Sequence, residues 1–347
     1  MSLRVAVIPE KLGSILSPCG TIRLSAFFDA MRSTAGGQWQ LRYLIPEEVT
    51  AFRPDVIVWQ RTAMADEQQV TSIAALAKRL SALTIYDLDD NLFDLDDEVE
   101  RRMYAAKLDA VEKSLQVADQ VWCSTSDLVE RAAGYSRNPP LLMVNALDPG
   151  LWGGALAPPA ERAAVHHLMY MGTRTHAADL ELLDEAMALL EEQQPGRFVL
   201  DIVGVASHFP DRPWRRVLQV PDHVGASYPA FVHWLRQQGA RQLGVAPLLS
   251  SPFNDCKSCI KVMDYAALGV PTLASDVPAY RPMQMDIECF KSGNTPTEWA
   301  LSIQRACGDD ALASRVLSSA RSRIGEAPFV EAVQLRMDAI SLGRHQA

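Results

Sequence analysis

The sequence predicts an α/β protein with two domains, each built on a parallel sheet that has helices on both faces. Short apolar runs of four to six residues alternate with helical patterns in both halves of the chain. The 347 residues exceed one ordinary core and fit two domains of about 150 residues each. We therefore expect an N-terminal domain over residues 1–150, a Gly-, Pro- and Ala-rich linker over 151–164, a second domain over 165–325, and a terminal helix over 326–347 that packs back on the N-terminal domain.

The first domain opens with an apolar strand at residues 3–8, a loop over 9–20 and a helix over 21–33, the order of a Rossmann-like unit. The loop has no GxGxxG, so the dinucleotide fingerprint is absent. Further strands are expected at 41–45, 55–59, 84–88, 120–123 and 141–144, with helices at 66–83, 99–117 and 127–133.

Ligands of parallel sheets collect at the carboxyl ends of the strands. In the first domain, polar residues follow those ends at Gln60, Arg61, 87–91, 124–126 and Asn145. Asp87 and Asp89 form a DxD, which suggests a divalent metal, but acids after a strand serve equally well as helix caps or as acceptors for substrate hydroxyls. No metal site is predicted.

The second domain repeats the alternation. A strand at 167–171 runs into residues 172–176, where a helix over 177–192 begins. Strands are expected at 198–203, 217–220, 243–247 and 271–274, with a turn at Gly225, a helix over 228–238, and an almost entirely helical stretch from 297 to the end.

A helix is predicted over residues 257–268, where Lys257, Lys261 and Asp264 are spaced i, i+4 and i+7 and share one stripe. A lysine in the first turn opposes the helix dipole, so an anion is expected to offset it. Free backbone N–H groups and two lysines suit a diphosphate, and the aspartate could accept hydrogen bonds from a ribose. The alternative is a solvated helix face with a Lys261 to Asp264 ion pair.

Composition excludes several classes of protein. The formal charge of −9 argues against general nucleic-acid binding. The densest basic patch, residues 212–216, could contact an anionic membrane surface or be a solvated loop. No apolar run is long enough to span a bilayer, and the N-terminus opens into a strand without a signal peptide, so a cytoplasmic protein is expected, with peripheral contact at the inner membrane face left open. The six cysteines include one CxxC, Cys256 and Cys259, without a second half for a zinc site.

Five segments in order resemble the GT-B glycosyltransferases, and among them the retaining class around glycosyltransferase family 4. They are STS at 124–126, VNALD at 144–148, YMGT at 170–173, the glycines at 204 and 225, and DYAALGVPTLAS at 264–275. The resemblance implies two Rossmann-like domains facing across a cleft, with the nucleotide sugar in the second domain and the acceptor in the first.

The resemblance and the positions of residues after strands together predict roles for individual residues, although Gly20 and Arg23 could equally be a turn glycine and a surface arginine. Donor-binding residues would be Gly172, Thr173, Arg174, Gly204, Gly225, Tyr228, Lys257, Ser258, Lys261 and Asp264. Acceptor-binding residues would be Gly20, Arg23, Arg61, Asp89 and Asp90, and the catalytic set would be Asp89, Asp90, Arg174 and Lys257. Cationic side chains would neutralise the diphosphate leaving group without a metal or other cofactor.

The chain departs from the family pattern at two points. Cys256 stands where the motif has its first glutamate, and Arg174 alone remains of an arginine and lysine pair. The sequence therefore predicts a retaining, metal-independent transferase that moves a sugar from a nucleotide diphosphate to a glycan or lipid-linked acceptor, in surface polysaccharide synthesis. The alternative is a catalytically silent GT-B module that binds a glycan or a partner. A sugar-nucleotide epimerase is a third class, but no paired acid and histidine motif supports it.

Overall fold

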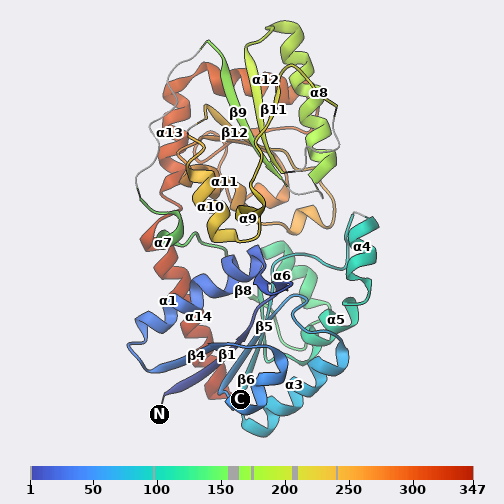
Figure 1. The fold of residues 1–347 in the computed structure, drawn as a ribbon, viewed down its shortest axis with the longest axis vertical. Helices are drawn as coiled ribbons and strands as arrows, with labels where there is room; N and C mark the ends of the chain where they lie inside the picture. Colours follow the sequence, from blue (N-terminus) through green and yellow to red (C-terminus); the bar gives the residue numbers. More distant parts are fainter. Residues whose placement is uncertain are drawn as a thin grey trace. The chain divides into compact units, whose positions relative to one another are not determined.

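The structure is a computed structural model that describes residues 2–96, 98–154, 164–172, 176–204, 210–239 and 241–346 (Figure 1). The chain forms two compact units. Unit 1 comprises Met1–Asp148, Cys256–Ser258 and Glu326–Ala347, and unit 2 comprises Pro149–Asp255 and Cys259–Gly325. Most of the stretch expected as a linker, residues 155–163, lies outside the described residues.

Unit 1 contains a six-stranded parallel sheet in the order β4-β1-β5-β6-β7-β8. The strands are β1 Leu3–Ile8, β4 Trp39–Tyr43, β5 Val56–Gln60, β6 Leu83–Leu88, β7 Gln120–Cys123 and β8 Leu141–Leu142. The helices are η1 Gly20–Ser25, α1 Ala26–Thr34, η2 Pro46–Glu48, α2 Val49–Phe52, α3 Glu67–Leu80, α4 Glu98–Ala105, α5 Leu108–Val117, α6 Ser126–Ala133 and α14 Glu326–Gln346.

Apolar side chains on both faces of this sheet account for its burial. One face packs against α1 and the terminal helix α14, where Phe27 and Phe329 stack with ring centroids 5.2 Å apart. On β5, Trp59 is fully buried and donates from Nε1 to Ser114 Oγ of α5 at 2.9 Å. The expected parallel sheet with helices on both faces is therefore present, and the terminal helix packs on unit 1.

Two local predictions in unit 1 were wrong. The helix expected over 99–117 is broken by a turn at residues 106–107 into α4 and α5; α5 buries an apolar face, whereas none of the residues of α4 is buried. The loop after β1 contains a short antiparallel hairpin, β2 Lys11–Leu12 and β3 Ile15–Leu16. Strands of two residues are too short to show an alternating pattern.

Unit 2 contains a second six-stranded parallel sheet, in the order β11-β10-β9-β12-β13-β14. The strands are β9 His166–Gly172, β10 Phe198–Gly204, β11 Arg215–Val217, β12 Leu243–Ala246, β13 Thr272–Ser275 and β14 Phe290–Ser292. The helices are α7 Pro149–Trp152, α8 Ala177–Gln193, α9 Asp222–Gly225, α10 Tyr228–Arg236, η5 Asn254–Cys256, α11 Ile260–Ala267, η6 Pro278–Tyr280, α12 Pro296–Gly308 and α13 Asp310–Arg321.

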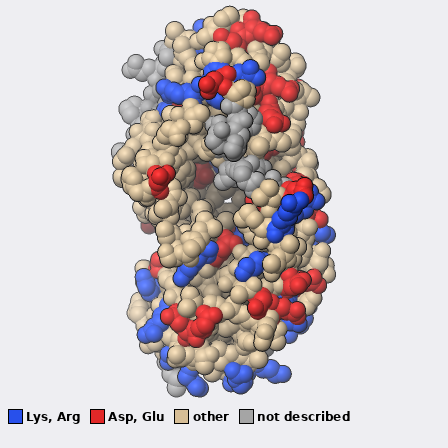
Figure 2. All heavy atoms as spheres, turned by 45° about the vertical axis from the view of Figure 1, so that its right-hand side comes forward, with Lys and Arg blue, Asp and Glu red and all other residues tan. Residues whose placement is uncertain are grey.

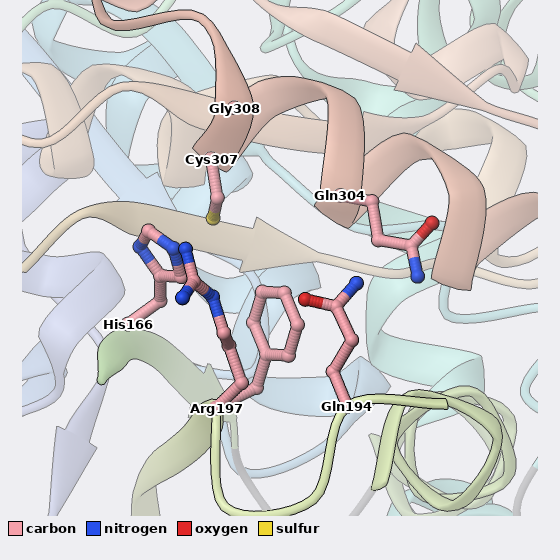
Figure 3. Close-up of a pocket in the computed structure, with 7 residues that line it drawn as sticks. His166, Gln194, Arg197, Gln304, Cys307 and Gly308 are labelled. Carbon is pink, nitrogen blue, oxygen red and sulfur yellow. The ribbon is translucent and has the colours of Figure 1, made fainter. Parts of the chain in front are cut away.

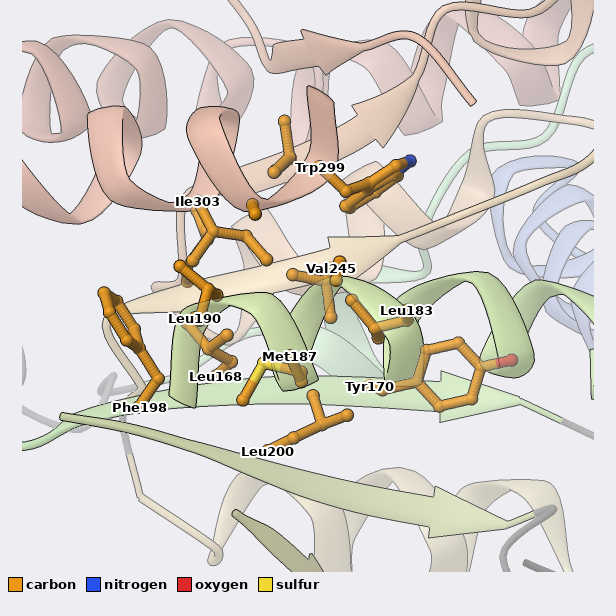
Figure 4. Packing of buried hydrophobic residues seen from close by; sticks show 14 of the residues in the cluster. Leu168, Tyr170, Leu183, Met187, Leu190, Phe198, Leu200, Val245, Trp299 and Ile303 are labelled. Carbon is orange, nitrogen blue, oxygen red and sulfur yellow. The ribbon is translucent and has the colours of Figure 1, made fainter. Parts of the chain in front are cut away.

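The core of unit 2 lies between its sheet and helices α8 and α12 (Figure 4). Leu183, Met187 and Leu190 of α8 are fully buried against the strands, and Trp299 and Ile303 of α12 complete the cluster. Burying side chains of this size stabilises the fold by about 1.5–3 kcal/mol each. The strand expected at 217–220 is displaced to β11, and β14 was not predicted.

None of the described helices is both long and apolar enough to cross a bilayer. Acidic and basic side chains are interspersed over the visible face of each unit (Figure 2).

Candidate functional site

The carboxyl edge of the unit 1 sheet carries a cluster of charges centred on Arg61, which follows β5 directly. Arg61 Nη1 lies 2.8 Å from Asp89 Oδ1 and 2.6 Å from Asp90 Oδ2, and Nε lies 3.2 Å from Glu10 Oε1. The Arg61 side chain is only 6% exposed. Burial opposes its charge, but Asp89, Glu10 and Asp90 outweigh burial and hold the pKa of Arg61 well above its usual value.

The end of β1 places Glu10 in this cluster, and Gly20 makes the placement possible. A Cβ on Gly20 would lie 2.8 Å from the Glu10 carbonyl oxygen. Thr62 Oγ1 donates to Glu10 Oε1 at 2.7 Å, and Tyr104 OH accepts from Arg61 Nη2 at 3.3 Å. Sequence reasoning missed Glu10 and Tyr104, although Glu10 could have been found from its position two residues beyond a strand.

Arg23 also lies at this edge, in a buried ion pair. Its Nη2 is 2.6 Å from Asp87 Oδ1 and its Nε donates to Asp87 Oδ2 at 3.2 Å, with both side chains fully buried. Its Nη1 donates to Asn145 Oδ1 at 3.0 Å, and Asn145 in turn donates to Ser258 Oγ at 2.9 Å. Arg23 therefore holds the groups beneath the predicted acceptor site and is not itself at the surface.

The helix expected to begin at Lys257 begins instead at Ile260, so that prediction was wrong. Residues Cys256–Ser258 belong to unit 1, where Thr125 Oγ1 donates to the Cys256 carbonyl at 2.8 Å and Lys257 Nζ lies 3.8 Å from Asp90 Oδ1. These contacts hold Cys256–Ser258 on unit 1, between the end of η5 and the start of α11. As a result Lys257 does not share a helical stripe with Lys261 and Asp264, and it joins the Arg61 cluster.

At the carboxyl edge of the unit 2 sheet, β9 and β10 end side by side in glycines. A Cβ on Gly204, whose φ is 100°, would lie 1.8 Å from the Gly172 carbonyl oxygen. A Cβ on Gly172 would lie 2.6 Å from Tyr170 OH. Gly204 therefore requires glycine, because a side chain there would meet backbone and its φ is positive, whereas a side chain at Gly172 would meet the end of the Tyr170 side chain.

We expect Gly204→Ala to destabilise unit 2 by about 3 kcal/mol, because the new methyl group meets backbone and the φ is unfavourable for L residues. Gly196→Ala is the matched control: its φ is 69° and nothing lies within 4 Å, so about 1 kcal/mol is expected. Urea unfolding of the two variants measures the difference. Equal losses would contradict the close approach.

Helix α11 carries two polar side chains of the predicted donor site, Lys261 and Asp264. Lys261 Nζ lies 5.8 Å from the centroid of the Tyr170 ring. Asp264 Oδ1 is buried and has no hydrogen-bond partner among the described residues. Burial raises the pKa of Asp264 from its usual 3.8 to about 7, and the charge of Lys261 acts in the opposite direction. A buried carboxylate oxygen without a partner favours a ligand that donates a hydrogen bond.

Tyr265 fixes the position of α11 against the sheet of unit 2. Its hydroxyl contacts the Met169 and Val245 carbonyls at 3.0 and 3.1 Å and accepts from Met171 N at 3.1 Å. Gly244 leaves room for the ring, since a Cβ there would lie 2.5 Å from it. The helix that holds Lys261 and Asp264 is therefore tied to β9 and β12.

A second polar group supports the same edge. His176 Nδ1 lies 2.6 Å from Asp179 Oδ2, and Asp179 Oδ1 accepts from Leu249 N at 2.7 Å. Tyr170 OH donates to the His176 carbonyl at 3.2 Å. These bonds join the start of α8 to the segment after β12.

Four further donor-site predictions are not decided by the geometry. Thr173 and Arg174 lie outside the described residues. Gly225 ends α9, and a Cβ there would lie 3.9 Å from Val220, so no steric demand for glycine exists. Tyr228 begins α10. Their roles stay predictions.

The basic patch at 212–216 is neutralised within unit 2. Arg215 pairs with Asp184, and Arg212 Nε lies 3.4 Å from the same carboxylate. Arg216 pairs with the fully buried Asp201 at 2.6 Å.

A cavity of about 400 Å³ lies in unit 2, lined by His166, Gln194, Arg197, Phe198, Gln304, Cys307 and Gly308 (Figure 3). His166 and Phe198 begin β9 and β10, whereas Gly172 and Gly204 end those strands. The cavity is thus at the amino edge of the sheet, away from the predicted donor site.

Among the described residues, no group of three or more His, Cys, Asp or Glu side chains could hold a metal ion.

Comparison with solved structures identifies the fold of the chain. No protein-family model matches the chain, and no curated protein matches it. Three similar solved structures are a glycosyltransferase of Rickettsia africae (TM-score 0.66, 11% identity, 99% of this chain and 98% of that one), HepE of Anabaena with UDP and glucose (0.61, 12%, 98% and 99%), and sucrose-phosphate synthase of Thermosynechococcus elongatus (0.63, 14%, 98% and 100%). The chain therefore has the GT-B fold, as the sequence predicted, with its polar clusters at the carboxyl edges of the two sheets.

Proposed function

We propose that the protein is a glycosyltransferase that binds a nucleoside diphosphate sugar at the carboxyl edge of the unit 2 sheet and transfers the sugar to an acceptor hydroxyl bound at the carboxyl edge of unit 1. The observation that carries the proposal is the buried Oδ1 of Asp264, which has no hydrogen-bond partner among the residues the structure describes and lies one helical turn from Lys261. A ribose hydroxyl would donate to that oxygen, and the lysine would face an adjacent phosphate.

The similar structures support a nucleotide sugar as donor. HepE of Anabaena was solved with UDP and with UDP-glucose, and a similar enzyme of Burkholderia xenovorans is a UDP-forming trehalose-phosphate synthase. Gly172 and Gly204 end β9 and β10 side by side at the carboxyl edge, where ligands of parallel sheets collect. We therefore propose that UDP is the first nucleotide to test.

The same proposal covers the charge of the leaving group, the stereochemistry of the transfer and the acceptor. Lys261 and Arg174 would neutralise the leaving diphosphate, so the transfer would need neither a metal nor another cofactor. Retention at the anomeric carbon would follow from a front-face reaction in which the departing phosphate takes the proton of the acceptor. The acceptor would be a glycan or a lipid-linked sugar in surface polysaccharide synthesis.

One observation favours a second candidate, a silent module that binds a nucleotide or glycan without transfer. Cys256, which stands at the family's first glutamate, is 5% exposed and lies in the segment that belongs to unit 1. A thiol there supplies no carboxylate to the donor sugar. Donor hydrolysis separates the two candidates, because only the enzyme releases free sugar.

Calorimetric titration with UDP, GDP, ADP and dTDP tests the donor site. We expect micromolar binding of one of them, weakened about tenfold in Lys261→Met because one charge-assisted contact to phosphate is lost. Arg305→Met is the matched control: it removes the same charge from the last turn of α12, where Arg305 pairs with Asp286 at 2.7 Å. Absence of binding to all four nucleotides, or equal weakening in the two variants, would overturn the donor site.

A further inference from the structure

The cavity at the amino edge of the unit 2 sheet has polar walls, and none of the described residues that line it is acidic. Its volume of about 400 Å³ falls in the range of small-molecule sites, about 300–1,000 Å³. His166 and Phe198, which stack with ring centroids 5.3 Å apart, are buried, whereas Arg197 between them in the chain is exposed. The cavity thus has a buried aromatic wall and a cation that solvent can reach.

Arg197 brings a positive charge to this cavity. Its guanidinium has neither an ion pair nor a hydrogen bond with any residue that the structure describes. The arginines of the 212–216 patch, by contrast, pair with Asp184 or Asp201. Two parallel N–H donors of an arginine match a carboxylate or a phosphate. The cavity therefore suits a ligand that carries one of these anionic groups.

The Cys307 thiol, which also lines the cavity, is neutral. Burial raises the pKa of Cys307 to about 12, the charge of Asp310 acts in the same direction, and the charge of Arg197 opposes both. Asp310 is the first residue of α13 and is not among the lining residues. The charged side chain in the lining is thus that of Arg197, with His166 beside it (Figure 3).

The opposite side of the cavity offers groups for hydroxyls. Gln194 and Gln304 lie together there, and the carboxamide of Gln194 has no hydrogen-bond partner among the described residues (Figure 3). A carboxamide both donates and accepts. Gln194 follows α8 and Gly308 ends α12, so the last carbonyls of two helices border the cavity. Helix carboxyl ends are partly negative, which disfavours a bare anion, whereas hydroxyl groups would donate to these oxygens.

We propose that this cavity binds a small hydroxylated anion, a sugar phosphate or a sugar acid. The anionic group lies against Arg197, and the hydroxyls bond the two glutamines and the helix ends. The site is separate from the proposed donor site, because β9 has seven residues and therefore spans about 20 Å between His166 and Gly172. The proposal does not depend on the proposed function.

The test is calorimetric titration of the full chain with glucose 6-phosphate, glucuronate, glucose and inorganic phosphate. Arg197→Gln removes the charge. Gly308→Leu keeps the charge and fills the cavity: a Cβ at Gly308 meets nothing within 4 Å, and its φ is not positive. Arg321→Gln is the matched control, since Arg321 is exposed at the far end of α13, a helix of 12 residues and about 16 Å. Hydrogen exchange of β9 and β10 verifies that each variant is folded.

We expect glucose 6-phosphate or glucuronate to bind wild type at least about tenfold more tightly than glucose or inorganic phosphate, because only these two offer both an anion and hydroxyls. The tighter of the two identifies the anionic group. Arg197→Gln and Gly308→Leu should each weaken this binding about tenfold or more, and Arg321→Gln less than about twofold.

Three results would overturn the proposal. The first is that neither glucose 6-phosphate nor glucuronate binds wild type, and the second is that both cavity variants bind as wild type does. The third is that Lys261→Met, and not Arg197→Gln, weakens binding, which would place the anion at α11. Failure of the proposed function shows separately, as absent binding of all four nucleotides and absent donor hydrolysis in wild type.

Discussion

Replacement of Asp87 by asparagine is expected to lower the free energy of unfolding of unit 1 by about 3–5 kcal/mol, because it breaks a buried ion pair from one side. The amide keeps the shape of the carboxylate but loses its charge. The fully buried guanidinium of Arg23 would then be a cation without the carboxylate that it contacts in wild type. An amide N–H₂ group would also face the guanidinium donors, so one hydrogen bond of the pair would be lost.

A neighbouring arginine increases the expected cost. Arg336 of α14 is also fully buried, donating to the Val144 carbonyl at 3.0 Å with its guanidinium 3.6 Å from the centroid of the Phe27 ring. Burial lowers the pKa of Arg336 well below its usual value, and the charge of Arg23 lowers it further, while Asp87 opposes both. Without Asp87, two buried cations would repel each other, and the packing of α14 on unit 1 would weaken.

Hydrogen exchange measured peptide by peptide is the suitable readout, because a chain of two units need not unfold in one step. We expect faster exchange in β5, β6 and α14, with β9 and β10 of unit 2 as the internal reference. Glu98→Gln is the control: it breaks the exposed pair of Glu98 and Arg102 on α4 and should cost less than about 0.5 kcal/mol.

A second substitution separates charge from shape. If the cost of Asp87→Asn arises from an orphaned charge, adding Arg23→Met should recover about 1–2 kcal/mol. Losses that simply add in the double variant would contradict this explanation.

The outline of the fold was predictable because buried parallel strands are apolar over their whole length. VIVWQ of β5 and LTIYDL of β6 are buried at every position, so each is visible as a short apolar run between helices. The strand ends follow from the same pattern. Arg61, Asp89, Asp90, Gly172 and Gly204 were accordingly placed at the correct edges of their sheets.

The start of α11 was not predictable, and the reason lies far away in the sequence. A lysine spacing of four residues favours a helix from Lys257, yet Thr125 and Asn145 bind Cys256 and Ser258 and hold that segment in unit 1. Tertiary hydrogen bonds thus override a local pattern. The internal pairing of Arg23 with Asp87 was hidden for the same reason, since 64 residues separate them in the chain.

The free energy of unfolding of unit 2 is expected to fall as the pH rises from about 4 to about 7, because the pKa of Asp264 is raised to about 7 in the folded protein. Between these values the unfolded chain has released the proton and the folded chain still holds it, so rising pH favours unfolding. A rise of about three units in the pKa of Asp264 corresponds to a decline of about 4 kcal/mol in the free energy of unfolding. Asp264→Asn should abolish this decline and stabilise unit 2 at pH 8, as urea unfolding at pH 5 and pH 8 would measure.

Asp211→Asn is the matched control for that experiment, since Asp211 is an exposed aspartate of unit 2. It should leave the pH dependence as in wild type. Lys261→Met should extend the decline to higher pH, because the lysine charge holds the pKa of Asp264 down. A pH profile in Asp264→Asn identical to that of wild type would show that another group titrates.

The same carboxyl should link nucleotide binding to pH with the opposite sign. A ribose hydroxyl bonds the ionised form of Asp264, so binding lowers the pKa of Asp264 and releases a proton between about pH 6 and 7. Nucleotide affinity should therefore rise up to about tenfold per pH unit below 7 and level off above it. Titrations in buffers of different ionisation enthalpy measure the released proton directly. Burial of Asp264 destabilises the ligand-free protein at neutral pH, so a ligand that donates a hydrogen bond to its oxygen recovers that free energy as affinity. The variant Asp264→Asn should therefore be more stable than wild type. It should also bind the nucleotide more weakly and release no proton. Retention of full affinity and proton release in that variant would remove Asp264 from the donor site.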